Sequence, residues 1–245
     1  MAGSIFSEKT QIANYETNLH GNITLNSLLN KIVQASEDQS NSLGLGTKVV
    51  QEDGVTWVVI QYDVDITRLP RAGEKIQAQT QGTFYTKNFA NRRFWLRDEE
   101  NQELVSVNSL WVMMDLKARK MVPISPEAVD GYGSEKVKRI ERMHKIAKIK
   151  DDDVLAMDFP VCFTNIDFNG HVTNTKYIDW MTNTLPFDFL KSHLPTNFKI
   201  KFEDEVRFGD DVTSQVKIID DTKTIHQILV NGKAKSIAEV NWKKI

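Results

Sequence analysis

The chain has 245 residues, 40% of them hydrophobic, which is enough apolar side chain for one large domain or two domains of about 120 residues. Its formal net charge of -2 provides no overall basic field for binding nucleic acid. The single cysteine, Cys162, excludes an intramolecular disulfide framework and a cysteine-rich zinc site.

The N-terminal residues lead directly into sequence with the pattern of a folded domain. No signal peptide, transit peptide or apolar run of membrane length is visible in the sequence. We therefore expect a soluble, cytoplasmic protein that does not act at a membrane.

The first half is predicted to contain one helix followed by a series of strands. Residues 1–18 are expected to form a strand, and leucine and isoleucine recur at helical spacing over 23–39. Runs rich in valine, isoleucine and aromatic residues, separated by turn residues, predict further strands. These strands are expected at 55–66, 75–87, 92–98 and 104–116. An N-terminal domain is therefore predicted at 1–125.

A linker is predicted at 126–152, where prolines and glycines are followed by a basic helix over 134–150. This segment contains seven Lys or Arg residues but only two glutamates. The expected apolar stripe consists of Val137, Ile140, Met143 and Ala147. The favoured interpretation is a connecting helix with a solvated basic face. The alternative is a docking surface for an acidic partner.

The same plan starts again at residue 153, which predicts a C-terminal domain over 153–245. A strand is expected at 154–163, a tight turn at 165–170 and a helix from about residue 171 to 181. Further strands are expected at 198–208, 211–219, 223–231 and 234–243.

The two halves are copies of one another. Residues 19–24 align without a gap on 168–173, and 73–79 align on 209–215. One amphipathic helix with several antiparallel strands is best accommodated by a sheet that curls around the helix. The sequence therefore predicts an α+β tandem (double) hot-dog, in which each copy is a curved antiparallel sheet wrapped around one helix. Hot-dog units commonly pair through their sheet edges, and a tandem chain is expected to supply this pair itself. A homodimer of the whole chain is left open.

A constellation of polar residues follows the first strand of the second copy. Asp167, Asn169 and His171 alternate along the predicted turn, next to the expected N-terminus of a helix. The free N–H groups and the helix dipole at such a place would stabilise an oxyanion formed during acyl transfer. The first copy has polar residues but no carboxylate at the equivalent positions, which are Asn18, His20 and Asn22. We expect one active site, in the C-terminal copy, while the N-terminal copy forms the substrate pocket.

The motif Asp167-x-Asn169-x-His171-Val172-x-Asn174-x-Lys176-Tyr177-Ile178-x-Trp180 resembles that of acyl-acyl-carrier-protein (acyl-ACP) thioesterases. Other segments across nearly the whole chain also look like landmarks of the family. These are Trp57-Val58-Val59, Arg68-x-Pro70, Gly73, Arg92-Arg93-x-Trp95, Ser109-x-Trp111-Val112-Met113-Met114-Asp115 and Phe202-x-x-Glu205.

The resemblance implies a tandem hot-dog hydrolase that releases free fatty acid from acyl carrier protein and ends fatty acid synthesis. It implies a catalytic set of Asp167, Asn169, His171 and Glu205. Many plant members have a cysteine directly after that glutamate, where this chain has Val206, and they carry a plastid transit peptide. The chain therefore looks like a bacterial-type member that acts on oleoyl or medium-chain acyl-ACP.

Thioester hydrolysis needs a nucleophile, stabilisation of the oxyanion and a path for the proton. Cys162 falls in an expected buried strand, where a thiol behaves as a small hydrophobe. Water activated by a carboxylate is therefore favoured, with Glu205 or Asp167 as the base. In this scheme His171 polarises the carbonyl and Asn169 orients the water or the thioester.

Glu205 presents a difficulty, because simple strand alternation from Phe198 places it on the outer face with Lys199 and Lys201. We expect either a β-bulge near Glu205 or a segment at the domain seam with both faces covered.

Large residues of the N-terminal copy are expected to bind the fatty acyl chain and set its length. The candidates are Leu25, Leu29, Trp57, Val59 and Tyr62.

The sequence has neither a glycine-rich phosphate loop nor a His-Glu-x-x-His pattern, so no nucleotide, metal or other cofactor is expected. Two alternative functions are a hot-dog enzyme acting on a coenzyme A thioester and a non-catalytic acyl-binding protein.

Overall fold

The computed structural model describes residues 3–150 and 153–245, and the chain divides into two compact units. The first unit comprises the described residues up to Ile23 together with Leu28–Met143. The second comprises Thr24–Ser27 and His144–Ile245. Within each unit the long strands pair antiparallel with their neighbours in the sheet.

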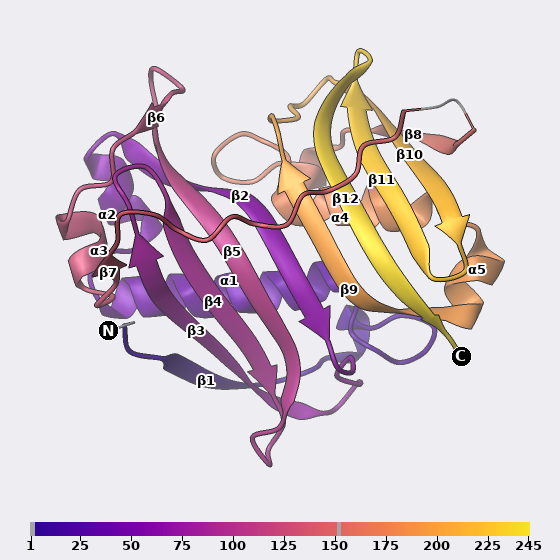
Figure 1. Ribbon diagram of the computed structural model, residues 1–245, viewed down its shortest axis with the longest axis horizontal. Helices are drawn as coiled ribbons and strands as arrows, with labels where there is room; N and C mark the ends of the chain where they lie inside the picture. The colour runs from indigo at the N-terminus through magenta and orange to yellow at the C-terminus, as the bar shows by residue number, and fades with distance from the viewer. Residues whose placement is uncertain (1–2, 151–152) are drawn as a thin grey trace. The chain divides into compact units, whose positions relative to one another are not determined.

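The first unit is a curved antiparallel sheet packed on one long helix, α1 (Leu25–Ser42) (Figure 1). The strand order is β1-β3-β4-β5-β2, with the short β6 on β5 and the short β7 parallel to β3. The strand bounds are β1 (Phe6–Gln11), β2 (Val55–Ile66), β3 (Lys75–Tyr85), β4 (Ala90–Arg97), β5 (Glu103–Asp115), β6 (Met121–Val122) and β7 (Glu135–Lys136). Short helices complete the unit: η1 (Asn14–Glu16), α2 (Thr47–Glu52) and α3 (Glu127–Asp130).

Hydrophobic periodicity explains why the helix and the sheet of this unit pack against each other. Leu28, Ile32 and Ala35 recur at helical spacing and are at most 1% exposed. On the strands, buried and exposed positions alternate, so that Ile76 and Ala78 of β3 also lie in the core. The helix stripe and the inner sheet face therefore bury each other's apolar surface.

The second unit repeats this topology. Its strand order is β8-β10-β11-β12-β9, which matches β1-β3-β4-β5-β2 element by element. The bounds are β8 (Leu155–Pro160), η2 (Phe163–Asn165), α4 (Asn174–Asn183), α5 (Phe187–Ser192), β9 (His193–Phe202), β10 (Asp211–Asp220), β11 (Lys223–Val230) and β12 (Lys233–Lys244). The helix α4 buries Ile178 and Met181. The predicted tandem hot-dog is thus confirmed.

The predicted basic helix over 134–150 is wrong, because residues 137–150 form neither a helix nor a strand. We call this extended segment the strap (residues 137–150). Every third side chain is partly buried, and all the others are exposed. The partly buried residues are Val137, Ile140, Met143, Ile146 and Ile149. A period of three matches an extended, polyproline-like ribbon, whereas a helix would repeat every 3.6 residues.

Some predicted boundaries were also wrong around the candidate site. The strand expected to contain Cys162 ends at Pro160, the helix expected from residue 171 starts at Asn174, and the strand expected to residue 208 ends at Phe202. The helices α2 and α5 were not predicted. Among the described residues, no helix has both the length and the apolar character needed to cross a membrane.

The core of the second unit contains a buried polar chain on β11 and β12. The indole N–H of Trp242 donates to Thr224 Oγ1 at 2.8 Å, and that oxygen lies 2.8 Å from Nε2 of His226. His226 is 1% exposed. Burial lowers the pKa of His226 from 6.5 to about 3, because a charged imidazole would be desolvated there.

This burial predicts a loss of stability in acid. Below about pH 6.5 the unfolded chain binds a proton at His226 that the folded state excludes until about pH 3, so stability falls as pH decreases through this window. The loss at pH 4.5 is roughly 2–3 kcal/mol. His226→Gln should show a smaller decrease in Tm between pH 7 and 4.5 than the wild type. An unchanged decrease would contradict the assignment.

Candidate active site

Asp167 builds the turn that carries the predicted site residues. One carboxylate oxygen accepts the backbone N–H of Asn169 at 2.8 Å and that of His171 at 3.3 Å. The Asp167 N–H donates to the His171 carbonyl at 2.8 Å, and the Gly170 N–H donates to the Asp167 carbonyl at 3.0 Å. Gly170 has a φ of 81°, a conformation that glycine adopts without strain. The turn is therefore held by the Asp167 side chain and by its own backbone hydrogen bonds, not by the helix that follows.

The first unit has the same turn with an amide in place of the carboxylate. Asn18 Oδ1 accepts the backbone N–H of His20 at 3.0 Å and that of Asn22 at 3.3 Å. The Asn18 N–H donates to the Asn22 carbonyl at 2.9 Å, as in the second unit. A neutral side chain thus suffices to form this turn.

The loop that follows β9 carries Glu205. Either a β-bulge or a segment at the domain seam was expected to explain its position, but the strand has already ended at Phe202. Two hydrogen bonds hold the loop through Val206: its N–H donates to the hydroxyl of Tyr177 on α4 at 2.9 Å, and its carbonyl accepts the Val172 N–H at 3.0 Å. Alternation along β9 therefore does not decide where the Glu205 side chain points.

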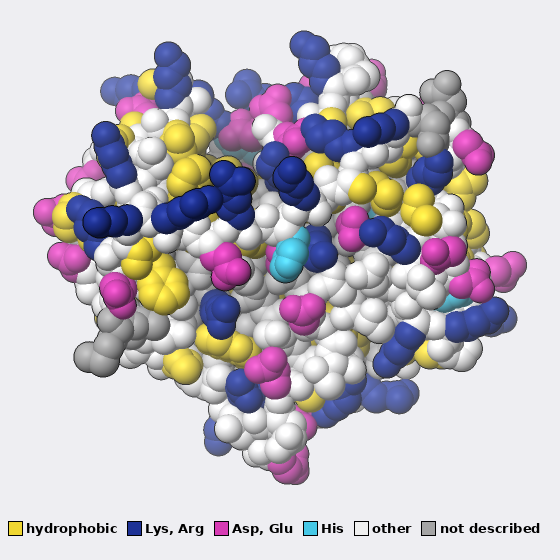
Figure 2. All heavy atoms as spheres, in the orientation of Figure 1, with side chains coloured by type: hydrophobic (Ala, Val, Ile, Leu, Met, Phe, Trp, Pro, Cys, Tyr) yellow, Lys and Arg dark blue, Asp and Glu magenta, His cyan; other side chains and the backbone are white. Residues whose placement is uncertain are grey.

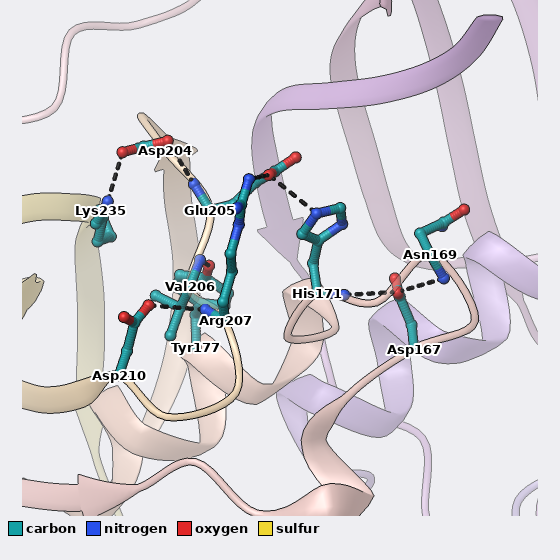
Figure 3. A network of polar contacts seen from close by, with 10 residues as sticks. All are labelled: Asp167, Asn169, His171, Tyr177, Asp204, Glu205, Val206, Arg207, Asp210 and Lys235. Atoms are coloured by element: carbon teal, nitrogen blue, oxygen red, sulfur yellow. Dashed lines mark hydrogen bonds and ion pairs between the residues drawn. The ribbon is translucent and has the colours of Figure 1, made fainter. Parts of the chain in front are cut away.

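These two segments bring a histidine and a glutamate into contact (Figure 3). His171 Nε2 lies 3.1 Å from Glu205 Oε2, and the side chains are 18% and 34% exposed. Arg207 Nη2 lies 3.6 Å from the same oxygen. The alignment of Gly73 with Gly209 places Leu69 of the first unit at the position of Glu205. With Asn22 at the position of His171, the first unit lacks both partners of this pair.

Charged pairs stabilise the Glu205 loop on both sides. Asp204 accepts a hydrogen bond from Lys235, which lowers the pKa of its carboxyl. Burial would raise the pKa of Glu203, but hydrogen bonds from Lys148 and Lys201 lower it overall. Both carboxylates therefore stay ionised at neutral pH, and Glu205 lies beside two fixed ion pairs.

Asn169 and Asp167 have different orientations in this arrangement. In Figure 3 the Asn169 side chain lies on the same side of the turn as the His171 ring, whereas the Asp167 carboxylate points back to the turn's backbone. The helix α4 begins only at Asn174, with Thr173 as its N-cap. The expectation that these residues surround a helix N-terminus is therefore wrong, since a separate turn precedes the helix.

Cys162 is exposed, which contradicts its predicted burial in a strand. It precedes η2, where its N–H donates to Asn165 Oδ1 at 2.8 Å and its thiol lies 3.8 Å from the Pro160 carbonyl oxygen. Within the part of the chain that the structure describes, neither His171 nor Glu205 is among these partners of Cys162. Burial no longer argues against a reactive thiol, but the thiol has no general base among its partners.

The predicted acyl-pocket residues do not share one environment. Leu29, Val59 and Tyr62 are at most 2% exposed in the first unit. Trp57 is partly buried against a different cluster, which consists of Val50, Tyr85, Met113, Ile124 and Val129. Leu25 belongs to the second unit, where it lines a small cavity together with Ile178 and Trp242.

Sequence reasoning missed two residues that shape the site. Tyr177 entered the sequence analysis only as one position of the long motif, although its buried hydroxyl holds the Glu205 loop. Arg207 was not considered. The long motif could have identified Tyr177, because a residue that only packs in the core does not need a hydroxyl group.

The chain is similar to known proteins both in sequence and in fold. The family model for the acyl-ACP thioesterase N-terminal domain matches residues 3–132, and that for the C-terminal domain matches 148–244. A palmitoyl-acyl carrier protein thioesterase of Gossypium hirsutum is 27% identical over 69% of this chain. That match spans 44% of the plant protein.

Solved structures match over almost the full chain. A protein from Lactobacillus plantarum assigned as an oleoyl thioesterase is 39% identical, with a TM-score of 0.97 over 99% of this chain and 97% of its own. The 12:0-ACP thioesterase from Umbellularia californica is 20% identical, with a TM-score of 0.89 over 98% of each chain, and supports the fold. With both family models matched, the chain belongs to the acyl-ACP thioesterase family.

Proposed function

We propose that the protein hydrolyses the thioester of fatty acyl-ACP and releases free fatty acid, with water activated by the pair Glu205 and His171. The observation that carries this proposal is the 3.1 Å contact between His171 Nε2 and Glu205 Oε2 on two loops of the second unit. Membership of the acyl-ACP thioesterase family supports the substrate class.

Glu205 is a better candidate than Asp167 for the general base. One Asp167 oxygen already accepts two backbone N–H groups, and Asn18 performs the same task without a charge. Glu205 instead directs its Oε2 to an imidazole and is partly open to solvent. A base must be within hydrogen-bond reach of the water that it deprotonates.

The proposed reaction balances with water alone. Glu205 accepts a proton as the water oxygen bonds to the thioester carbon, and the Asn169 amide donates to the carbonyl oxygen as it gains charge. The C–S bond then breaks, and the proton passes through His171 to the departing sulfur. The products are a carboxylic acid and the thiol of the carrier.

The acyl chain is proposed to bind in the first unit. Leu29, Val59 and Tyr62 remain candidates for residues that set its length, because all three are in that unit's core. Leu25 is a weaker candidate, because it belongs to the second unit. Each methylene of acyl chain that is buried contributes about 0.8 kcal/mol.

The base assignment predicts unequal effects of two isosteric changes. Glu205→Gln should lower kcat for acyl-ACP by about 10²-fold or more, the usual scale for a lost general base. Asp167→Asn should keep the turn and the wild-type Tm, and lower kcat by about tenfold at most, because an amide oxygen accepts the same N–H groups. Steady-state kinetics with acyl-ACP and acyl-CoA of equal chain length provide the measurement. Equal losses in the two variants would move the base to Asp167, and no turnover of acyl-ACP by the wild type would refute the function.

The Tyr177 hydroxyl is predicted to act through the loop that it holds. Tyr177→Phe removes the acceptor for the Val206 N–H, at a cost of about 1–3 kcal/mol for an unsatisfied buried donor. We expect kcat to fall about tenfold with little change in KM, since the loop positions Glu205. Tyr15→Phe is the matched control, because Tyr15 is 89% exposed. A lower Tm with unchanged kcat would limit Tyr177 to a structural role.

Cys162 is predicted to be dispensable. It is exposed, so Cys162→Ala should leave both Tm and kcat within about twofold of the wild type. A loss of kcat on the order of 10³ in a folded variant would instead identify the thiol as the nucleophile.

A further inference from the structure

The strap is the most strongly charged segment of the chain. Residues 137–150 contain six Lys or Arg residues and one carboxylate, Glu141, in a protein whose net charge is -2. All six basic residues are exposed: Lys138, Arg139, Arg142, Lys145, Lys148 and Lys150. Figure 2 shows Lys and Arg side chains gathered over the first-unit part of the strap, whose course Figure 1 gives.

The backbone of the strap separates charge from apolar surface. In the first unit, the Val137 N–H donates to the Tyr85 carbonyl at 2.8 Å, and the Asn108 amide donates to the Met143 sulfur at 3.3 Å. These contacts attach the strap to β3 and β5. Because every third side chain faces inward, the two between them face solvent, and most of these are cationic.

Most cations of the strap lack a counter-ion. Among the residues that the structure describes, Lys138, Arg139, Arg142 and Lys145 form no ion pair, whereas Lys148 pairs with Glu203 at 3.0 Å. Outside the strap some cations do have a counter-ion, as in Lys31–Glu16 and Arg97–Glu103. A row of unpaired like charges repels itself and adds nothing to folding. An acidic surface that approaches the row would offset this repulsion.

The strap also leads to the candidate site. In the second unit Lys148 pairs with Glu203, which is two residues before Glu205. A partner bound to the second-unit part of the strap, residues 144–150, would therefore lie next to the loop that carries the proposed base.

We propose that the strap is the docking surface for the carrier protein and that the carrier meets it with an acidic face. This inference rests on the proposed function for the identity of the partner. A membrane surface fits less well, because the apolar side chains of the strap face inward and cannot insert into lipid. Single-stranded nucleic acid fits less well, because the strap has no aromatic residue on which bases could stack.

The test compares two variants of the full chain with equal change in charge. The strap variant combines Lys138→Gln, Arg139→Gln, Arg142→Gln and Lys145→Gln. The control variant combines Lys48→Gln, Lys75→Gln, Lys117→Gln and Lys191→Gln, four exposed cations outside the strap. Each is assayed with acyl-ACP and with the same acyl group on N-acetylcysteamine, a thioester without a carrier.

The strap variant should raise KM for acyl-ACP about fivefold or more at low salt, with kcat nearly unchanged and no effect on the carrier-free thioester. High salt should raise the wild-type KM toward that of the variant, because salt screens exposed charges. The control variant should resemble the wild type. Failure of the proposed function differs from failure of docking, because in the former neither thioester is hydrolysed by the wild type.

Four results would overturn the docking proposal. An unchanged KM in the strap variant excludes the strap, and an equal effect in the control variant assigns the attraction to net charge. An equal loss with both substrates assigns the strap a structural role. Binding of the wild type to anionic phospholipid vesicles that the strap variant loses, with KM for acyl-ACP unchanged, would make a membrane the partner.

Discussion

The acceptance of two backbone N–H groups by one side-chain oxygen shapes the candidate site. In the second unit Asp167 provides this oxygen, and in the first unit Asn18 does, with matching distances of 2.8 and 3.3 Å against 3.0 and 3.3 Å. The turn fixes the backbone of residue 171 before α4 begins. The imidazole is therefore presented from a rigid turn, and its orientation does not depend on the helix dipole or on the helix N–H groups.

The repeat shows how one fold hosts a site in one copy only. Both copies keep the turn and the loop that hydrogen-bonds to it: Ile23 donates to the Pro70 carbonyl at 2.8 Å, and Val172 donates to the Val206 carbonyl at 3.0 Å. The copies differ in side chains that the turn does not need. His171 and Glu205 meet in the second unit, while the first has Asn22 and Leu69 at those positions. The two copies thus share the scaffold, while the His171–Glu205 pair occurs in one of them.

The position of Glu205 and the display of charge on the strap share a physical feature, because both segments lie outside the helices and the sheet ladders. The Glu205 loop is held by Tyr177 through one backbone N–H, and the strap is attached through Val137 and Met143. In such segments the side chains need not follow the alternation of a strand or the spacing of a helix. This allows Glu205 to reach His171 and allows the cations of the strap to face solvent together.

The sequence by itself determined the class of fold, because hydrophobic period and turn residues are local signals that both copies repeat. It also identified the alignment of Asn18 with Asp167, which their matching hydrogen bonds confirm. Three features were decided only by the tertiary structure. The stripe Val137, Ile140 and Met143 fits a helix as well as a ribbon of period three, and contacts of the strap with the sheet select the ribbon. Cys162 is exposed because its strand ends two residues earlier. Glu205 reaches His171 because a hydroxyl from α4, distant in sequence, captures the backbone of the next residue. Long-range hydrogen bonds of this kind leave no periodic trace in a single sequence.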